Sequence, residues 1–194
     1  MTDALIRRLQ QTVRSGRWVD VLFASQPRVP PPPPADPGVV AAAEAEVGFG
    51  FPDLLRRMYL EVANGGFGPC YGLLGLDGGA TDDIGYNALD QWFNARQDMA
   101  AARRRKPLRE LTLFPCFYAG CNEYSCLDCR NADGPMWRYD LSRRPARFEP
   151  EGFTLAGLME RWAEGPTSAE PAAAPDRGGT KAPRGSRSPR RRGR

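Results

Sequence analysis

The sequence predicts an α+β fold, and three observations lead to that prediction. Apolar residues recur at helical spacing in several segments before residue 105 and once more between residues 155 and 165. Three neighbouring strand-like segments lie between residues 111 and 140, which indicates an antiparallel sheet. The hydrophobic fraction of 41% and the aromatic fraction of 10% suffice for one core in a chain of 194 residues.

Two helices are predicted near the N-terminus. Residues 3–14 place four apolar side chains on one helical face, namely Leu5, Ile6, Leu9 and Val13. A proline run at residues 30–34 forces an extended path, which we interpret as a rigid connector. Asp36 is a favourable N-cap and Pro37 suits the first helical position, so a second helix is expected to run through residue 48.

A third helix is expected to begin at Pro52 and to end at the sequence Asn64-Gly65-Gly66. Asn and Gly adopt the left-handed conformation at a helix exit more readily than other residues. We therefore assign a role in turn geometry to a set of four residues, which are Asn64, Gly65, Gly66 and Gly72. The glycine-rich segment 68–76 is predicted to be a strand that approaches another backbone closely.

An acidic segment at residues 77–90 contains four aspartates and no basic residue, and it leads into a predicted helix at residues 89–105. The spacing of the aspartates matches no calcium-binding loop, so a divalent-cation site is not favoured. A solvated acidic loop is the simplest interpretation. The alternative is a contact face for a basic partner.

Three strands are predicted at residues 111–118, 123–130 and 135–140, and residues 131–134 (Asn-Ala-Asp-Gly) are typical of a hairpin turn between the last two. A final helix is expected at residues 155–165, with Thr154 as its N-cap.

Five cysteines raise the question of a metal or redox site. Cys121, Cys126 and Cys129 together with a fourth thiol are numerically enough for structural zinc. On a strand, however, Cys126 and Cys129 point to opposite faces, so the strand and zinc interpretations exclude each other. A reactive thiol is not supported either, because the nearby acidic residues disfavour a thiolate. We expect no metal, no disulfide and buried, inert cysteines.

The composition disfavours most classes of enzyme. The sequence contains no histidine, which removes the commonest general base and the commonest metal ligand. It also lacks the glycine-rich phosphate loop, the dinucleotide-binding fingerprint and the hydrolase nucleophile elbow. Catalysis by carboxylates alone is the class that the composition leaves open. We expect a non-enzymatic protein without a cofactor.

Charge divides the chain into two parts. From Gly165 onward the sequence carries 8 basic and 2 acidic residues, whereas residues 1–164 carry 19 basic and 21 acidic residues. The C-terminal tail is rich in Pro, Gly, Ser and Arg, so it is predicted to be disordered, either as a solvated extension or in weak, nonspecific contact with nucleic acid. The sequence shows no secretory signal and no membrane-spanning run, so a cytoplasmic location without membrane contact is expected.

Several segments together resemble a known family. "FPDLLRRMYLEVANGGFGPCYGLLGL", "AGCNEYSCLDC", "GPMWRYD" and a closing helix with Trp162 are similar to the SUKH superfamily, in particular to its branch related to the fungal Smi/Knr cell-wall-assembly regulators. The resemblance covers roughly residues 30–165. It divides the chain into an N-terminal helix and lead-in (1–29), a SUKH-like domain (30–165) and the tail (166–194). It implies helices packed on a curved, mainly antiparallel sheet, without a metal on the Cys-bearing strand.

The resemblance also implies a function. Most bacterial members of the superfamily resemble immunity proteins, which bind and block a cognate toxin, commonly a nuclease of a polymorphic toxin system. A basic toxin domain would suit the mildly acidic body of this chain. The expected contact residues are acidic or aromatic, namely Asp82, Asp83, Tyr86, Glu123 and Asp128. The alternative is a regulatory scaffold that recruits endogenous proteins or nucleic acid through its proline run and basic tail.

Overall fold

The computed structural model describes residues 2–21, 29–102, 112–144 and 146–165. The predicted disordered tail at residues 166–194 and the nucleic-acid contact expected from it lie outside these residues. The elements in chain order are α1 (Thr2–Arg14), α2 (Pro37–Val47), α3 (Asp53–Arg57), the π-helical turn η1 (Met58–Val62), α4 (Ala88–Ala102), β1 (Leu113–Gly120), β2 (Glu123–Asp128), β3 (Pro135–Asp140), β4 (Arg147–Thr154) and α5 (Leu155–Glu164).

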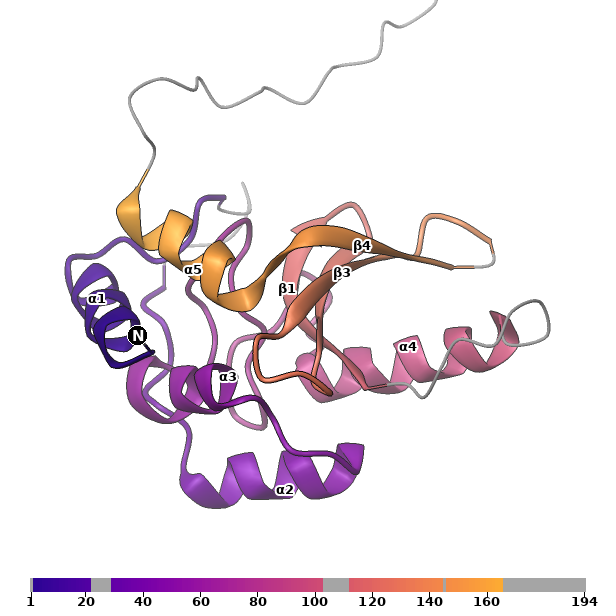
Figure 1. Cartoon of the computed structure of the whole chain (residues 1–194), viewed down its shortest axis with the longest axis horizontal. Coiled ribbons are helices and arrows are strands. Elements are labelled where there is room, and N and C mark those ends of the chain that lie inside the picture. The colour runs from indigo at the N-terminus through magenta and orange to yellow at the C-terminus, as the bar shows by residue number, and fades with distance from the viewer. Residues whose placement is uncertain (1, 22–28, 103–111, 145, 166–194) are drawn as a thin grey trace, which may run out of the picture.

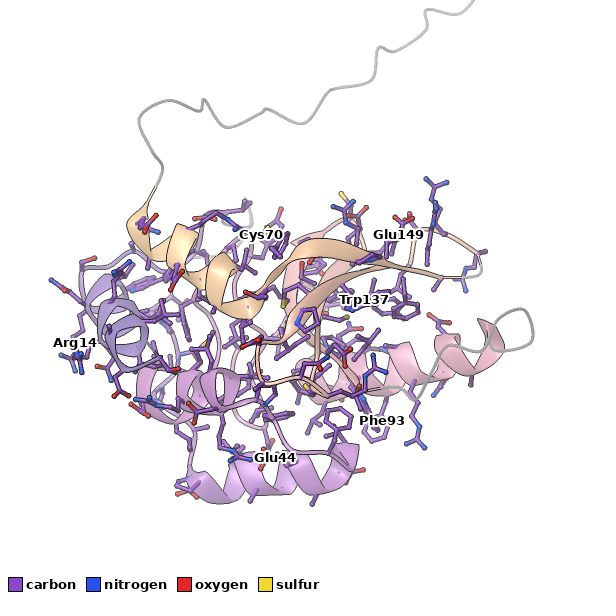
Figure 2. The ribbon with its side chains drawn as sticks, viewed as in Figure 1. Arg14, Glu44, Cys70, Phe93, Trp137 and Glu149 are labelled. Atoms are coloured by element: carbon purple, nitrogen blue, oxygen red, sulfur yellow. The ribbon has the colours of Figure 1, made fainter. Side chains whose placement is uncertain are left out.

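The α+β prediction is confirmed. The four strands form one antiparallel sheet in the order β1-β2-β3-β4. Helices α1 and α3 lie at one end of the molecule, α2 contacts η1 and α4, and α4 lies along the sheet (Figure 1). Register shifts interrupt the β1–β2 and β3–β4 ladders, and such bulges bend the strands that contain them. Side chains fill the space between the sheet and the helices (Figure 2).

The helix-capping predictions are confirmed. The carboxylate of Asp36 accepts a hydrogen bond of 2.7 Å from the backbone N–H of Gly38, and Pro37 is the first residue of α2. The hydroxyl of Thr154 accepts a hydrogen bond of 3.2 Å from the backbone N–H of Gly157 at the start of α5. Both caps satisfy donors that have no partner within the helix.

The N-terminal helix is part of the same core as the rest of the fold. Its residues Leu5, Ile6 and Leu9 are buried in the main hydrophobic cluster, and α1 packs against η1 and α5. This burial follows from the predicted apolar face, whose three central residues point inward.

The predicted strand at residues 68–76 is wrong. This segment does not join the sheet and makes only single bridges, from Gly68 to Val19 and from Leu73 to Phe117. Its backbone is instead held by irregular bonds, among them those from the N–H of Leu73 to the carbonyl of Phe67 (2.7 Å) and from the N–H of Leu74 to the carbonyl of Cys116 (2.7 Å). At its end, the side chain of Asn64 accepts from the N–H of Leu76 (2.8 Å) and donates to the carbonyl of Asp77 (3.0 Å). These bonds replace the regular ladder that a strand would need.

Glycines allow this irregular segment to pack closely. Gly65, Gly66 and Gly72 have φ values of 83°, 75° and 97°, in the left-handed region. Gly75 has no such φ, but a Cβ atom there would lie 2.3 Å from the backbone nitrogen of Ala80. The close approach of two backbones that the glycines indicated therefore occurs, although between loop segments.

The sequence prediction also missed one strand. β4 pairs with β3 at the edge of the sheet, with Pro150 opposite Trp137. Pro150 and Gly152 made the segment a poor strand candidate, because Pro lacks the N–H that a central strand requires. An edge strand tolerates this loss, since one of its sides makes no ladder hydrogen bonds.

Candidate partner-binding surface

The segment of residues 81–87, here called the acidic loop, is built around the buried carboxylate of Asp82. This residue is 4% exposed. Its Oδ1 accepts hydrogen bonds from the backbone N–H groups of Ile84 (3.1 Å) and Tyr86 (2.9 Å). Its backbone N–H donates to the carbonyl of Tyr86 (2.9 Å), which closes the loop. Asp82 thus fixes the shape of the acidic loop from the inside.

A row of aromatic rings crosses the sheet next to this loop. The rings stand on directly paired positions of neighbouring strands and lie 4.6 to 6.1 Å apart between centroids, in the order Tyr118, Tyr124, Tyr139 and Phe148. Tyr71 extends the row beyond β1, with its ring centroid 5.3 Å from that of Tyr118. We call these five residues the aromatic row.

Three tyrosines of the aromatic row donate hydrogen bonds to aspartates of the acidic loop or α4. The pairs are Tyr118 with Asp83 (3.2 Å), Tyr124 with Asp82 (3.0 Å) and Tyr139 with Asp98 (2.7 Å). Burial, together with the neighbouring carboxylates, raises the pKa of Tyr118 to about 12. The same causes, burial first, raise the pKa values of Tyr124 and Tyr139. All three phenols therefore stay protonated donors at neutral pH.

Two cavities flank the acidic loop. The first, of about 240 Å³, is lined mainly by apolar groups, among them Trp18, Val21, Val29, Tyr71 and Leu73. The second also measures about 240 Å³ and is lined by polar side chains together with apolar ones. We call it the amide pocket and define it by Tyr86, Gln91, Asn94, Gln97, Asp98 and Asn122.

Exposed apolar side chains gather around these two cavities. Within the described ranges, the exposed large hydrophobic residues are Val21, Val29, Ile84, Tyr86 and Phe93. Val21 and Val29 line the first cavity, and Ile84 and Tyr86 line the amide pocket. Ile84 is 65% exposed and Tyr86 is 42% exposed, although both are apolar enough to favour burial. Apolar groups clustered in this way are typical of an interaction surface.

The aspartates of this surface have no cationic partner among the residues that the structure describes. Asp82, Asp83, Asp90 and Asp98 take part in none of the ion pairs found there. Elsewhere the carboxylates of helices and strands are commonly paired, as Glu44 is with Arg56 at 2.6 Å. The surface around the acidic loop therefore carries uncompensated negative charge.

A comparison of the sequence with models of known protein families identifies the family of this chain. The model of the SMI1 / KNR4 family (SUKH-1) matches residues 34–162. The chain belongs to the SMI1 / KNR4 family. The SUKH-1 match begins after α1 and includes the acidic loop, α4 and the whole sheet. No curated protein matches the sequence significantly.

In this SUKH-1 chain, the predicted contact residues do not form one surface. Asp83 and Tyr86 are exposed on the acidic loop, as a contact role requires. Asp82 is buried and cannot contact a partner directly. The expectation for Asp82 is corrected accordingly, because its carboxylate is fully used inside the loop.

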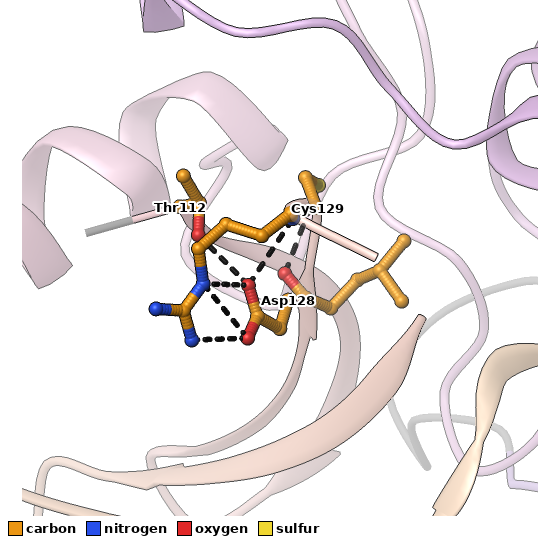
Figure 3. A network of polar contacts seen from close by, with 5 residues as sticks. Thr112, Asp128 and Cys129 are labelled. Atoms are coloured by element: carbon orange, nitrogen blue, oxygen red, sulfur yellow. Dashed lines mark hydrogen bonds and ion pairs between the residues drawn. The ribbon is translucent and has the colours of Figure 1, made fainter. Parts of the chain in front are cut away.

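Asp128 also needs correction, because it is 2% exposed and lies at the far end of β2. It accepts hydrogen bonds from the hydroxyl of Thr112 (2.8 Å) and from Nε of Arg130 (2.9 Å), as Figure 3 shows. It lies five positions along the strand from Glu123, which corresponds to roughly 16 Å. Its role is to hold the end of β2, away from the acidic loop.

Glu123 lies close to the acidic loop in the fold but points elsewhere. It precedes Tyr124 on β2, and successive side chains of a strand point to opposite faces. Its carboxylate lies 3.9 Å from Nε of Arg138 on β3, so its charge is partly compensated. Glu123 therefore belongs to the other face of the sheet from the aromatic row.

The environment of Asp128 leads to a testable pH dependence. Burial alone would raise the pKa of Asp128, but hydrogen bonds from Arg130 and Thr112 outweigh burial and hold the pKa below its usual value. The lowered pKa means that Asp128 stabilises the fold above the unfolded-state pKa of about 3.9 and loses this contribution as pH falls through the folded-state pKa. Asp128→Asn should therefore cost about 2 kcal/mol at pH 7 and progressively less below pH 4 in urea unfolding.

A matched control for this experiment is Asp133→Asn, which removes an exposed carboxylate from the hairpin turn between β2 and β3. Its stability difference should be small at every pH. If the difference in the free energy of unfolding between Asp128→Asn and the wild type stays constant from pH 7 to pH 2, the proposed role of the charged carboxylate is contradicted.

The five cysteines of this SUKH-1 chain are all free. Burial raises the pKa values of Cys70, Cys116, Cys126 and Cys129, so these thiols are protonated at neutral pH. Cys121 is exposed in the turn between β1 and β2, and Cys70 and Cys129 are only partly buried, contrary to the expectation that all are buried. Within the described ranges, no group of three or more Cys, Asp or Glu side chains is arranged to hold a metal ion.

The sequence analysis did not predict the amide pocket, although the spacing of its residues on α4 is visible in the sequence. Gln91, Asn94 and Asp98 are spaced by three and four residues, which places them on one face of α4. Polar residues at this spacing are usually assigned to the solvent side of a helix. The partners of this face, Asn122 in the β1–β2 turn and Tyr124 on β2, are distant in sequence and give no local sequence signal.

Proposed function

We propose that the protein is a non-enzymatic binding protein of the immunity type, which covers the active surface of a basic toxin domain, such as a nuclease. The observation that carries the proposal is the combination of uncompensated aspartates and exposed apolar side chains around the acidic loop. Membership of the SMI1 / KNR4 family supports it, since bacterial relatives in the superfamily resemble immunity proteins.

The physical character of the surface suits a tight protein complex. Aromatic and apolar groups such as Tyr86 and Ile84 are typical of the desolvated centre of an interface. Aspartates around them attract a basic partner over a distance of about one Debye length, which accelerates association. The exposed apolar side chains and the negative charge therefore both favour a basic protein partner.

Two further features support a role without catalysis. The sequence has no histidine, and the described buried thiols have raised pKa values, so they are poor nucleophiles. The tyrosines next to the acidic loop are protonated hydrogen-bond donors that hold aspartates in place.

No helix among the described residues is long and apolar enough to cross a membrane.

The alternative role as a scaffold is less well supported by the fold. Gly66 packs against Pro31 and Pro32, and the carbonyl of Pro33 accepts a hydrogen bond of 3.0 Å from the N–H of Asn64. The proline run thus contacts the rest of the fold, which leaves less of it available to recruit a partner. The basic tail, the other element of the scaffold hypothesis, lies outside the described residues.

The proposal is tested by capture and by protection. Full-length bait and bait truncated after Gly165, both nuclease-treated, are incubated with a lysate of the native organism, and retained proteins are identified by mass spectrometry. We expect one stoichiometric partner with a toxin-like domain, retained by both baits. Co-expression should then rescue cells from that domain. A partner that remains toxic in the presence of the protein would refute the immunity role.

The double substitution Asp83→Arg and Tyr86→Ala should weaken binding of this partner by about 100-fold, because it removes an aromatic anchor and reverses a charge. Binding is measured by surface plasmon resonance at two salt concentrations, and the association rate should also become less salt-dependent. Asp133→Arg on the distant β2–β3 turn is the matched control and should bind as the wild type does. Equal affinity of the double variant and the wild type would remove the acidic loop from the interface.

A further inference from the structure

We propose that the amide pocket is a receptor for a single arginine side chain of the partner protein. This inference rests on the proposed function insofar as the occupant belongs to a protein partner. It goes further because it assigns a specific site and a specific chemical group, the guanidinium.

The size of the pocket suits one side chain. Its volume of about 240 Å³ lies below the range of roughly 300 to 1,000 Å³ typical of pockets that enclose whole small molecules. At about 30 Å³ per water molecule, this space corresponds to roughly eight waters. A long side chain entering from a partner surface displaces water on that scale, whereas a nucleotide or a cofactor needs more room.

The polar groups of the pocket include several acceptors of hydrogen bonds. Gln91, Asn94, Gln97 and Asn122 each contribute an amide oxygen as well as an NH2 donor, and Asp98 contributes a carboxylate, which only accepts. A guanidinium has five N–H donors in one plane and no acceptor, so it matches several oxygens at once. An ammonium has only three donors around a point charge and matches this arrangement less completely.

Gln91 provides an independent sign that the pocket lacks a partner group. This residue is 1% exposed, and its Nε2 donates to Asp82 at 2.7 Å and to the hydroxyl of Tyr124 at 2.8 Å. Its Oε1, by contrast, has only a long contact of 3.4 Å from Nδ2 of Asn94, beyond the usual range of 2.7 to 3.2 Å. A buried acceptor is therefore almost unused, next to an amide that also lines the pocket.

The charge of the surroundings favours a cation. The carboxylate of Asp98 lines the pocket, and the buried Asp82 lies directly behind Gln91. Neither forms an ion pair with any residue in the described ranges. A cation in the pocket would therefore meet the carboxylate of Asp98, with that of Asp82 behind Gln91, without displacing an existing cation, which offsets part of its desolvation cost.

The rim of the pocket supplies the apolar contacts that an arginine stem needs. Ile84, Tyr86 and Leu141 line the pocket together with the polar groups. Arginine packs its methylene groups along apolar surface and stacks its guanidinium on aromatic rings. Tyr86 is exposed enough to offer its ring to such a group.

The first experiment uses the isolated full-length protein and N-acetyl-arginine amide as the probe, followed by two-dimensional ¹H–¹⁵N NMR. We expect saturable shifts at millimolar probe, centred on the amides of Tyr86, Gln97, Asp98 and Asn122. N-acetyl-citrulline amide, which has the same shape without the charge, should give no saturable shifts, and the lysine analogue should bind several-fold more weakly. Equal titration by citrulline or lysine, or shifts centred elsewhere, would overturn the assignment.

Two variants test the pocket in the same titration. Asp98→Asn removes the charge but keeps an acceptor for Tyr139, and it should weaken probe binding about fivefold or more. Gln97→Phe, at an exposed position of α4, should fill the pocket and abolish binding without affecting the core. Asp133→Asn is the control with the same loss of charge and should leave binding unchanged. Retained binding in both pocket variants would overturn the inference.

Experiments with the partner, once it is identified, test the arginine receptor and the proposed function separately. Asp98→Asn and Gln97→Phe should each weaken the complex by about tenfold, and an Arg→Ala scan of the partner should reveal one residue whose effect disappears in the Gln97→Phe background. If the partner is neutralised equally well by both variants, the immunity role stands and the arginine receptor is refuted. If the probe binds but no toxin is found, the receptor stands and the proposed function falls.

Discussion

Replacing Gly75 with alanine is expected to lower the free energy of unfolding by about 3 kcal/mol or more. A Cβ atom at this position would lie 2.3 Å from the backbone nitrogen of Ala80 and 2.6 Å from the carbonyl oxygen of Asn64. Both atoms belong to main chain that is hydrogen-bonded across this contact, since the N–H of Ala80 donates to the carbonyl of Asn64 (2.9 Å). Overpacking against main chain cannot be relieved by a change of rotamer, so the cost exceeds that of a tight side-chain contact.

Gly50→Ala is the matched control for this variant. Gly50 is also without a positive φ, and the nearest atom to its Cβ position is 3.7 Å away, at the end of the Arg56 side chain. Its substitution should change stability by less than about 1 kcal/mol. Urea unfolding followed by tryptophan fluorescence measures both. Similar midpoints for Gly75→Ala and Gly50→Ala would show that the backbone contact is absent in solution.

Asp82→Ala is expected to cost about 3 kcal/mol and to disorder the acidic loop. The substitution leaves the N–H groups of Ile84 and Tyr86 and the hydroxyl of Tyr124 without their buried acceptor. Each unsatisfied buried donor costs on the order of 1 to 3 kcal/mol, although the loop can expose some of them to water. Loss of the loop's shape should also abolish partner binding, since Tyr86 would no longer be presented in a fixed position.

Asp83→Ala is the appropriate control, because Asp83 is the exposed neighbour and is bonded to Tyr118 at 3.2 Å. We expect a loss below about 1 kcal/mol. Hydrogen exchange of the amides at residues 84 and 86 distinguishes the two variants directly, with fast exchange only in Asp82→Ala. Protected amides in Asp82→Ala would contradict the role of this carboxylate as the anchor of the loop.

Local signals were enough to predict the capped helices and three of the four strands of the sheet. Asp36 and Thr154 cap helices through bonds to residues two or three positions away, and such contacts are encoded by short stretches of sequence. The segment 68–76 failed for the opposite reason. Its conformation depends on bonds to residues outside the segment, such as those from Leu74 to Cys116 and from Leu76 to the side chain of Asn64, so β-propensity within the segment was overridden.

The candidate site was predictable only in part. The charge of the acidic loop and its Tyr86 could be read directly, but the burial of Asp82 beside the exposed Asp83 could not. That difference depends on Gln91 and on Tyr124, which stands 42 residues away in the chain. The prediction that Asp128 contacts a partner was wrong for a similar reason, because hydrogen bonds from Thr112 and Arg130 hold its carboxylate at the end of the sheet. Contacts between distant segments decide which carboxylates reach a partner.

The anchoring of the acidic loop from within has a consequence for how such a protein can diversify. Its shape depends on Asp82 and the groups behind it, whereas Asp83, Ile84 and Tyr86 present their side chains outward. Substitutions at these three outward positions alter what a partner meets while the inner frame persists. A lineage can thus acquire a new binding preference by a few replacements at the loop's tip, without having to evolve the scaffold again.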